Sequence, residues 1–180
     1  AQIANNILPG EKIDSIAYGC TSGSVAIGNK RIAEEIHKSK AGVSVVTPIS
    51  ATIKALTNLK IKKIAVLTPY PKKVNKTIFD YITKSNFEIT SFSSFNLEYD
   101  SEIASVDPKY LIEIVNALDH KDADAIFISC TALRAVEVLD QIEKQVSKYV
   151  ISSNQAMIWD CLRSVNIKNI INGYGKLFSH

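Results

Sequence analysis

Two cysteine turns hold the residue types in this sequence that are best suited to covalent or proton-transfer chemistry. Cys20 lies in IAYGCTS, residues 16–22, and Cys130 lies in IFISCTAL, residues 126–133. Each segment places an apolar, strand-like run before a cysteine, a threonine and the start of a predicted helix. A helix N-terminus offers unpaired N–H groups and positive potential, which favour a thiolate and hold carboxylates or oxyanions. Each turn therefore predicts a nucleophile or base beside a site for an anion.

Hydroxyl-bearing residues follow both thiols. Thr21 and Ser22 come after Cys20, and Thr131 comes after Cys130. In a parallel α/β sheet the ligand crevice lies beyond the carboxyl ends of the strands, where both cysteines are expected. Two such turns facing one crevice are arranged to act on opposite faces of one small substrate carbon.

The same patterns also allow interpretations without catalysis. A cysteine at a strand end is often a small buried hydrophobic residue. The segment GCTSGS, residues 19–24, is a possible phosphate loop, although it lacks the GxxxxGK[ST] form. Cys161 lies in the middle of a predicted helix, which favours packing. Because Cys20 and Cys130 lie in matching strand–Cys–Thr–helix segments, a functional role is favoured over packing for these two cysteines.

Composition excludes several classes of function. The chain has 180 residues, 46% of them hydrophobic and 22% charged, as is usual for a globular protein. Its net charge of +3 is spread along the chain, so nucleic-acid binding has little support. Apolar runs such as 64–67 and 125–128 are too short to span a bilayer, so no membrane partner is expected.

Cysteine and histidine usage argues against metal and protease chemistry. The three cysteines have no CxxC or Cys/His ligand spacing, so no metal site is predicted. Their odd number and the lack of a leader sequence suggest reduced thiols in the cytoplasm. No histidine lies beside a strand-end cysteine, which disfavours a Cys–His protease. Because the chain begins at Ala1 and residues 1–8 resemble the end of a helix, we expect a preceding N-terminal segment.

The elements that must position the two turns alternate along the chain. Strands are predicted at 13–18, 43–47, 63–68, 87–95, 125–129 and 149–152, and helices at 25–39, 50–59, 74–84, 108–118, 132–146 and 155–165. This alternation predicts an α/β fold with a largely parallel sheet. The repeated strand–Cys–Thr–helix pattern predicts two pseudo-symmetric α/β units.

Five motifs together resemble one known group of enzymes. They are GCTSGS at 19–24, LTPYPKKVN at 67–75, FISCTAL at 127–133, SSNQAMIWDCLR at 152–163 and GYGKL at 173–177. In this order they resemble the maleate isomerase and arylmalonate decarboxylase branch of the aspartate/glutamate racemase superfamily, the ectoine-utilisation protein group above all. The resemblance covers nearly the whole chain.

This resemblance implies a domain organisation and a cofactor-free enzyme. Two flavodoxin-like domains with parallel sheets would enclose the active site, the first from residues 1–60 plus 155–180 and the second from 61–154. An N-terminal strand of the first domain, with a substrate-binding asparagine, would belong to the expected preceding segment. The family uses no metal, pyridoxal phosphate or nucleotide, and its members commonly self-associate, which implies a homo-oligomer.

The resemblance also implies residue roles. Cys20 matches the cysteine that attacks the alkene carbon in maleate isomerases, and Cys130 matches the one that delivers or removes a proton. Tyr70 matches a tyrosine that hydrogen-bonds a substrate carboxylate. The turn positions whose N–H or hydroxyl groups bind carboxylate oxygens are matched by Thr21, Ser22, Thr131 and Ala132.

Asp100 is a departure from the family pattern. It stands where maleate isomerases have an asparagine, although Asn96 is nearby. An ionised acid at that position would repel a dianionic substrate such as maleate.

Three functions therefore remain open. The first is a cis–trans isomerase of a small dicarboxylate, with Cys20 adding to the double bond and Cys130 handling the proton. The second is an amino-acid or hydroxy-acid racemase or epimerase in which the two thiols act as base and acid. The third is a carboxylate-binding protein without turnover. A decarboxylase is disfavoured because that branch of the family retains only the second-domain cysteine.

Overall fold

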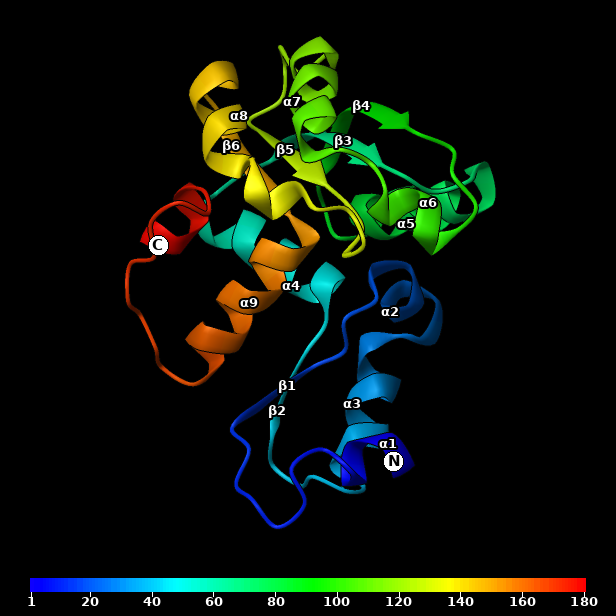
Figure 1. Ribbon diagram of the computed structural model, residues 1–180, viewed down its shortest axis with the longest axis vertical. Coiled ribbons are helices and arrows are strands. Elements are labelled where there is room, and N and C mark those ends of the chain that lie inside the picture. Colours follow the sequence, from blue (N-terminus) through cyan, green and yellow to red (C-terminus); the bar gives the residue numbers. More distant parts are fainter.

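A computed structural model describes residues 1–180 and contains two parallel β-sheets with helices around them (Figure 1). The smaller sheet pairs β1 (Ser15–Ala17) with β2 (Ser44–Val46). The larger sheet has the order β4-β3-β5-β6, formed by β3 (Lys63–Thr68), β4 (Glu88–Ser94), β5 (Ala125–Ile128) and β6 (Tyr149–Ser152). Every strand pair is parallel, which confirms the predicted α/β class.

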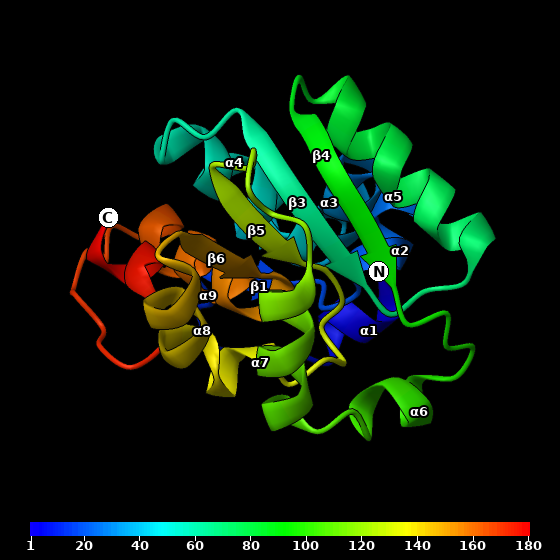
Figure 2. The same ribbon diagram turned by 90° about the horizontal axis from the view of Figure 1, so that it is seen from above.

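The helices connect these strands in chain order. They are α1 (Gln2–Asn5), α2 (Thr21–Ile27), α3 (Asn29–His37), α4 (Pro48–Asn58), α5 (Lys72–Lys84), α6 (Asp100–Ala104), α7 (Pro108–Ala117), α8 (Leu139–Val146) and α9 (Ser153–Ser164), with 3-10 turns η1 (Ala135–Glu137) and η2 (Lys176–Ser179). In Figure 1, α7 and α8 lie above the larger sheet and α4 and α5 lie below it, and in Figure 2 α7 and α8 are in front of the sheet. No helix combines the length and the apolar character needed to cross a membrane.

Two helix predictions need correction. The helix predicted over 25–39 begins earlier, at Thr21, and is divided at Gly28, whose φ of +91° does not continue a helix. The helix predicted over 132–146 begins only at Leu139, after η1. The Asn154 side chain donates to the carbonyl oxygens of residues 131 and 133 at 3.0 and 3.5 Å. These carbonyls therefore accept a side-chain donor in place of the backbone N–H groups of a helix.

The central strands of the larger sheet form the core of the protein. Residues 64–66 of β3 and all four residues of β5 are completely buried. A continuous apolar run is what a strand covered on both faces requires. Leu67 pairs with Ile128, so the segments after β3 and β5 emerge at the same edge of the sheet. These segments contain Tyr70 and Cys130.

The last long helix joins distant parts of the chain. α9 packs against α4, β1 and β2, and also contacts β6. Lys54 of α4 forms an ion pair with Asp160 of α9 at 2.7 Å, and the Asp160 side chain is only 6% exposed. The division of the chain into domains of residues 1–60 plus 155–180 and 61–154 stays a prediction.

The GYGKL motif has a structural explanation. The N–H of Gly175 donates to Asp140 at 2.6 Å, and Gln155 Nε2 donates to the carbonyl oxygen of Tyr174 at 2.6 Å. Gly175 has a φ of +85°, and a Cβ there would collide with Gln155 Nε2. The side chain of Gln155 is completely buried, so it has no room to move aside.

We expect Gly175→Ala to lower the free energy of unfolding by about 2–3 kcal/mol, because it adds a collision to an unfavourable backbone angle. Gly173→Ala is the matched control, since Gly173 has a φ of +92° with open space around its Cβ position. It should lose only about 1 kcal/mol. Urea unfolding of both variants measures the difference, and equal losses would contradict the close approach to Gln155.

Candidate functional site

Cys20 lies directly before α2 and caps this helix with its sulfur. Its Sγ accepts the N–H of Gly23 at 3.3 Å, and Ser22 Oγ lies 3.8 Å away. A Cβ on Gly23 would lie 2.9 Å from this sulfur and 2.9 Å from the Tyr18 hydroxyl. The glycine is therefore required for the approach of the sulfur to the helix end. The Cys20 side chain is exposed, as a nucleophile that meets a substrate must be.

Cys130 lies two residues beyond β5 in a conformation that non-glycine residues rarely adopt. Its φ is +95°, and only 7% of the residue is exposed. The backbone N–H of Cys130 donates to Ser153 Oγ at 3.1 Å, a long-range contact that helps to hold this conformation. Strained backbone of this kind is concentrated at functional sites, because the surrounding structure must maintain it.

The environment of Cys130 favours the neutral thiol. Burial raises the pKa of the Cys130 thiol, and the charge of Asp100 adds a smaller effect in the same direction. Hydrogen bonds from the Tyr70 hydroxyl and from the N–H groups of Ala132 and Leu133 lower this pKa in part. Although residues 131–134 are not helical, the N–H groups of Ala132 and Leu133 still face the sulfur. The net direction is upward, so Cys130 carries its proton at neutral pH.

Tyr70 is a buried hydrogen-bond donor beside Cys130. Burial, and next the neighbouring Cys130 thiol, raise the pKa of Tyr70 well above its usual range, while the hydroxyls of Ser129 and Thr21 lower it in part. The phenol therefore stays neutral. The backbone of Tyr70 is held by Asn75, whose Nδ2 donates to the Tyr70 carbonyl oxygen at 2.6 Å. Asn75 thus has a structural role in the TPYP turn.

Hydrogen bonds join the two cysteine turns directly. Thr131 Oγ1 donates to the carbonyl oxygen of Gly19 at 2.7 Å, across 112 positions of sequence. The turn after β5 accordingly runs down toward α2 in Figure 1. Because Gly19 and Thr131 each adjoin one of the two cysteines, this bond brings the backbone segments of both thiols together.

A second connection passes through Ser153, the first residue of α9. Thr21 Oγ1 donates to Ser153 Oγ at 3.0 Å, and the same oxygen accepts the Cys130 N–H. Ser153 is completely buried, so both bonds are shielded from water. Sequence analysis missed this residue. Its position directly after β6 could have indicated a place in the site, because β6 neighbours β5 and ends at the same edge of the sheet.

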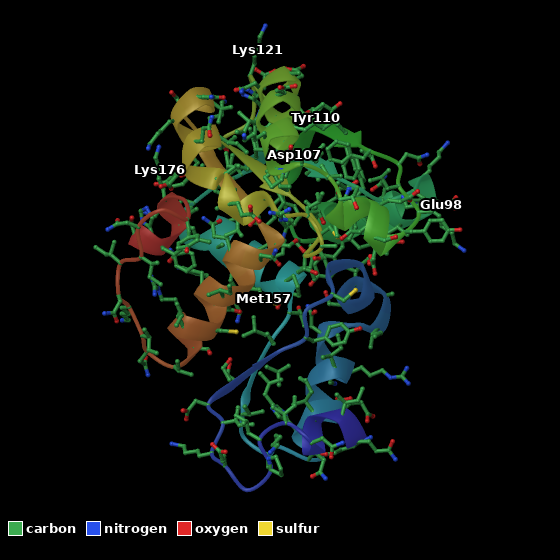
Figure 3. All side chains as sticks on the ribbon, viewed as in Figure 1. Glu98, Asp107, Tyr110, Lys121, Met157 and Lys176 are labelled. Atoms are coloured by element: carbon green, nitrogen blue, oxygen red, sulfur yellow. The ribbon has the colours of Figure 1, made fainter.

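The remaining predicted residue, Asp100, lies at the margin of this site. It begins α6 and is exposed, and its charge reaches the Cys130 thiol without a hydrogen bond to it. Figure 3 shows Glu98, just before α6, at the outer edge of the molecule. Ser22 lies beside the Cys20 sulfur and Ala132 beside the Cys130 sulfur, whereas the Thr131 hydroxyl is bonded to the Gly19 carbonyl. No group of three or more His, Cys, Asp or Glu side chains is arranged to hold a metal ion.

We expect Ser153→Ala to lower the free energy of unfolding by about 1–3 kcal/mol, because the buried Cys130 N–H and Thr21 hydroxyl lose their acceptor. Ser164→Ala is the control on the same helix, since the exposed Ser164 hydroxyl bonds only the Cys161 carbonyl. It should change stability by less than about 0.5 kcal/mol. Urea unfolding tests both, and equal small effects would show that Ser153 does not join the turns.

A second prediction concerns the pH dependence of labelling at Cys130. Only the thiolate reacts with iodoacetamide, and a raised pKa leaves less thiolate at a given pH. The labelling midpoint of Cys130 should therefore lie above the ordinary thiol value of 9.0. Tyr70→Phe should move it higher, because the hydroxyl bond that lowers the pKa is lost, whereas Tyr110→Phe, at an exposed tyrosine, should not. Site-resolved mass spectrometry over a series of pH values measures this, and a midpoint below 9.0 would refute the assignment.

Comparison with known proteins gives consistent matches over this chain. The sequence profile of a family described as arylmalonate decarboxylase matches residues 10–178. Maleate isomerase of Geobacillus stearothermophilus is 28% identical over 176 residues, which is 93% of this chain and 70% of that protein. Arylmalonate decarboxylase of Bordetella bronchiseptica is 26% identical over 144 residues, covering 78% of this chain and 60% of that protein.

The solved structures agree with the sequence matches. The maleate isomerase Iso of Pseudomonas putida S16 superposes with a TM-score of 0.87 at 26% identity, over 92% of this chain and 70% of that one. A cysteine-to-alanine variant of the same enzyme, solved with maleate, gives a TM-score of 0.87 at 25% identity, with the same coverage. These matches confirm the resemblance that the five motifs predicted.

Proposed function

We propose that this chain, a member of the arylmalonate decarboxylase family, is an isomerase. It would interconvert the cis and trans forms of a small unsaturated dicarboxylate without a cofactor. The observation that carries the proposal is the joining of two cysteine turns through Thr131–Gly19 and Ser153. Relatives named maleate isomerase, and the Pseudomonas putida S16 enzyme solved with maleate, support this class of substrate.

The proposed reaction uses Cys20 as the nucleophile. Its thiolate forms a C–S bond to one alkene carbon, and the π electrons move to the other carbon and its carboxylate. Cys130 donates its thiol proton to that carbon, which leaves a saturated thioether. Rotation about the new single bond is then free. Removal of a proton by the Cys130 thiolate and cleavage of the C–S bond give the trans alkene, so atoms and electrons balance without an added reactant.

The different environments of the two thiols support this division of roles. Cys20 is exposed and lies at a helix end, where an attacking sulfur reaches substrate. Cys130 is buried with a raised pKa, which suits a proton donor at neutral pH. A racemase would use its two thiols as alternating acid and base, and this asymmetry favours the isomerase.

The carboxylates of the substrate would be held by neutral donors. We assign this role to the hydroxyl groups of Tyr70 and Ser22 and to the backbone N–H groups of Thr21, Thr131 and Ala132, because the hydroxyls of Thr21 and Thr131 already donate to Ser153 and to the Gly19 carbonyl. The raised pKa of Tyr70 keeps its hydroxyl protonated, as a donor to a carboxylate must be. The exposed Asp100 acts against the binding of a dianion, and solvent weakens this effect.

The decisive test is conversion of maleate to fumarate by the full chain, followed by proton NMR. Cys20→Ala and Cys130→Ala should each lower kcat/KM by about a thousandfold or more, because each removes a reacting group. Cys161→Ala, at a cysteine of α9 away from both turns, should stay within about twofold of the parent chain.

Other outcomes distinguish the alternatives. Deuterium incorporation at the α-carbon of an amino or hydroxy acid, without fumarate formation, would favour a racemase. If both cysteine variants bind maleate as tightly as the parent chain, and the parent chain does not turn it over, the protein binds carboxylates without catalysis.

A further inference from the structure

A groove between α5 and β4 combines aromatic rings with positive charge and contains no residue of the two cysteine turns. It has a volume of about 660 Å³. Phe79 of α5 and Phe92 of β4 line it with ring centroids 5.8 Å apart, and Phe79 is 41% exposed. The other lining residues are polar, namely Lys72, Lys73, Asn75 and Lys76. Exposed apolar surface that polar residues surround is typical of an interaction site.

Two of the three lysines in this α5–β4 groove have no acidic partner within the protein. Lys76 is paired with Asp80 at 2.6 Å, whereas the exposed Lys72 and Lys73 form no ion pair. Unpaired positive charge beside apolar rings complements a partner that carries carboxylates together with an aromatic side chain. The groove therefore calls for an acidic and aromatic segment of polypeptide.

The chain itself carries a segment of this chemistry. Residues 98–102, EYDSE, lead from β4 into α6 and are called the acidic segment below. Tyr99 is 64% exposed, and Glu98 and Asp100 on either side of it are exposed and form no ion pair. Glu102 accepts the N–H groups of Glu98 and Tyr99 at 3.2 and 3.1 Å and holds the segment in this conformation. The segment thus presents an aromatic ring between two unpaired carboxylates.

The groove and the acidic segment lie on the same side of the molecule. α5 packs against β4, and β4 is followed by the acidic segment. In Figures 1 and 2 both α5 and α6 are on the right, and Figure 3 shows Glu98 at the outer edge on that side. A two-fold interface needs one surface that carries both complementary parts, because each copy gives to the other what it receives. This side of the protein meets that requirement.

We propose that the α5–β4 groove binds the acidic segment of a second copy of this chain, so that a two-fold dimer contains the contact twice. The Tyr99 ring of each copy covers the phenylalanine rings of the other. Glu98 and Asp100 face the two unpaired lysines of the groove. An unrelated acidic protein would pair only with the lysines, whereas a second copy pairs with the lysines and the carboxylates of the same surface. This interface does not depend on the proposed function.

Charge reversal in each half of the contact tests the dimer, measured by sedimentation velocity of the full chain over a series of concentrations. The parent chain should dimerise, and added salt should weaken the dimer because exposed charges are screened. Lys73→Glu and Glu98→Lys should each raise the dimer Kd by about tenfold or more, since each places like charges opposite one another at both contacts. Lys121→Glu is the matched control, because Lys121 is an exposed lysine without an ion pair at another end of the molecule in Figure 3. It should stay within about twofold of the parent chain.

A mixture of the two variants gives the sharpest result. In a mixed dimer of Lys73→Glu with Glu98→Lys, one contact has both charges reversed and the other has neither, so both contacts are attractive again. The mixture should therefore dimerise within about threefold of the parent chain, although each variant alone does not. Recovery in the mixture also shows that both variants are folded.

Three outcomes would overturn this interface. A parent chain that stays monomeric excludes a second copy and leaves the groove to a different partner. A dimer that neither reversal weakens uses another surface of the protein. A mixture that dimerises no better than the separate variants shows that Lys73 and Glu98 do not face each other across the contact. None of these measurements involves turnover, so they hold whether or not the chain isomerises maleate.

Discussion

The arrangement of this protein depends on the hydrogen bonds that join two turns lying more than a hundred residues apart. Thr131 reaches the Gly19 carbonyl at 2.7 Å, and the buried hydroxyl of Ser153 accepts from both Thr21 and the Cys130 N–H. A completely buried polar group is costly unless it is bonded, so this network favours one relative position of the turns. These bonds hold the backbone segments of both cysteines side by side, as the proposed shared substrate requires.

Solvation then gives the two thiols different properties. Cys20 lies exposed at the end of α2, and Gly23 allows its sulfur to approach the backbone. Cys130 is enclosed with Tyr70, and burial outweighs the hydrogen bonds that would stabilise a thiolate. Similar local sequences therefore produce a nucleophile candidate and a proton-donor candidate, because their surroundings differ in access to water.

Asp100 adds negative charge at the margin of the site. It is exposed, and its charge raises the pKa of the Cys130 thiol to a smaller extent than burial does. The Tyr70 phenol beside this thiol stays neutral, because burial raises its pKa well above its usual range. The side-chain donor nearest Cys130 is therefore an uncharged group, and its effect on a ligand is greatest where the ligand displaces water.

The sequence by itself determined the α/β class, the buried strands β3 and β5 and the location of both cysteines after strand ends, because these follow from local apolar patterns. The family motifs also identified Tyr70. Only the tertiary structure decided that Ser153 joins the turns, that Cys130 has a φ of +95° and that no helix begins at Ala132. These features depend on bonds from α9 to a segment more than twenty residues away, and short-range propensity carries no information about such partners.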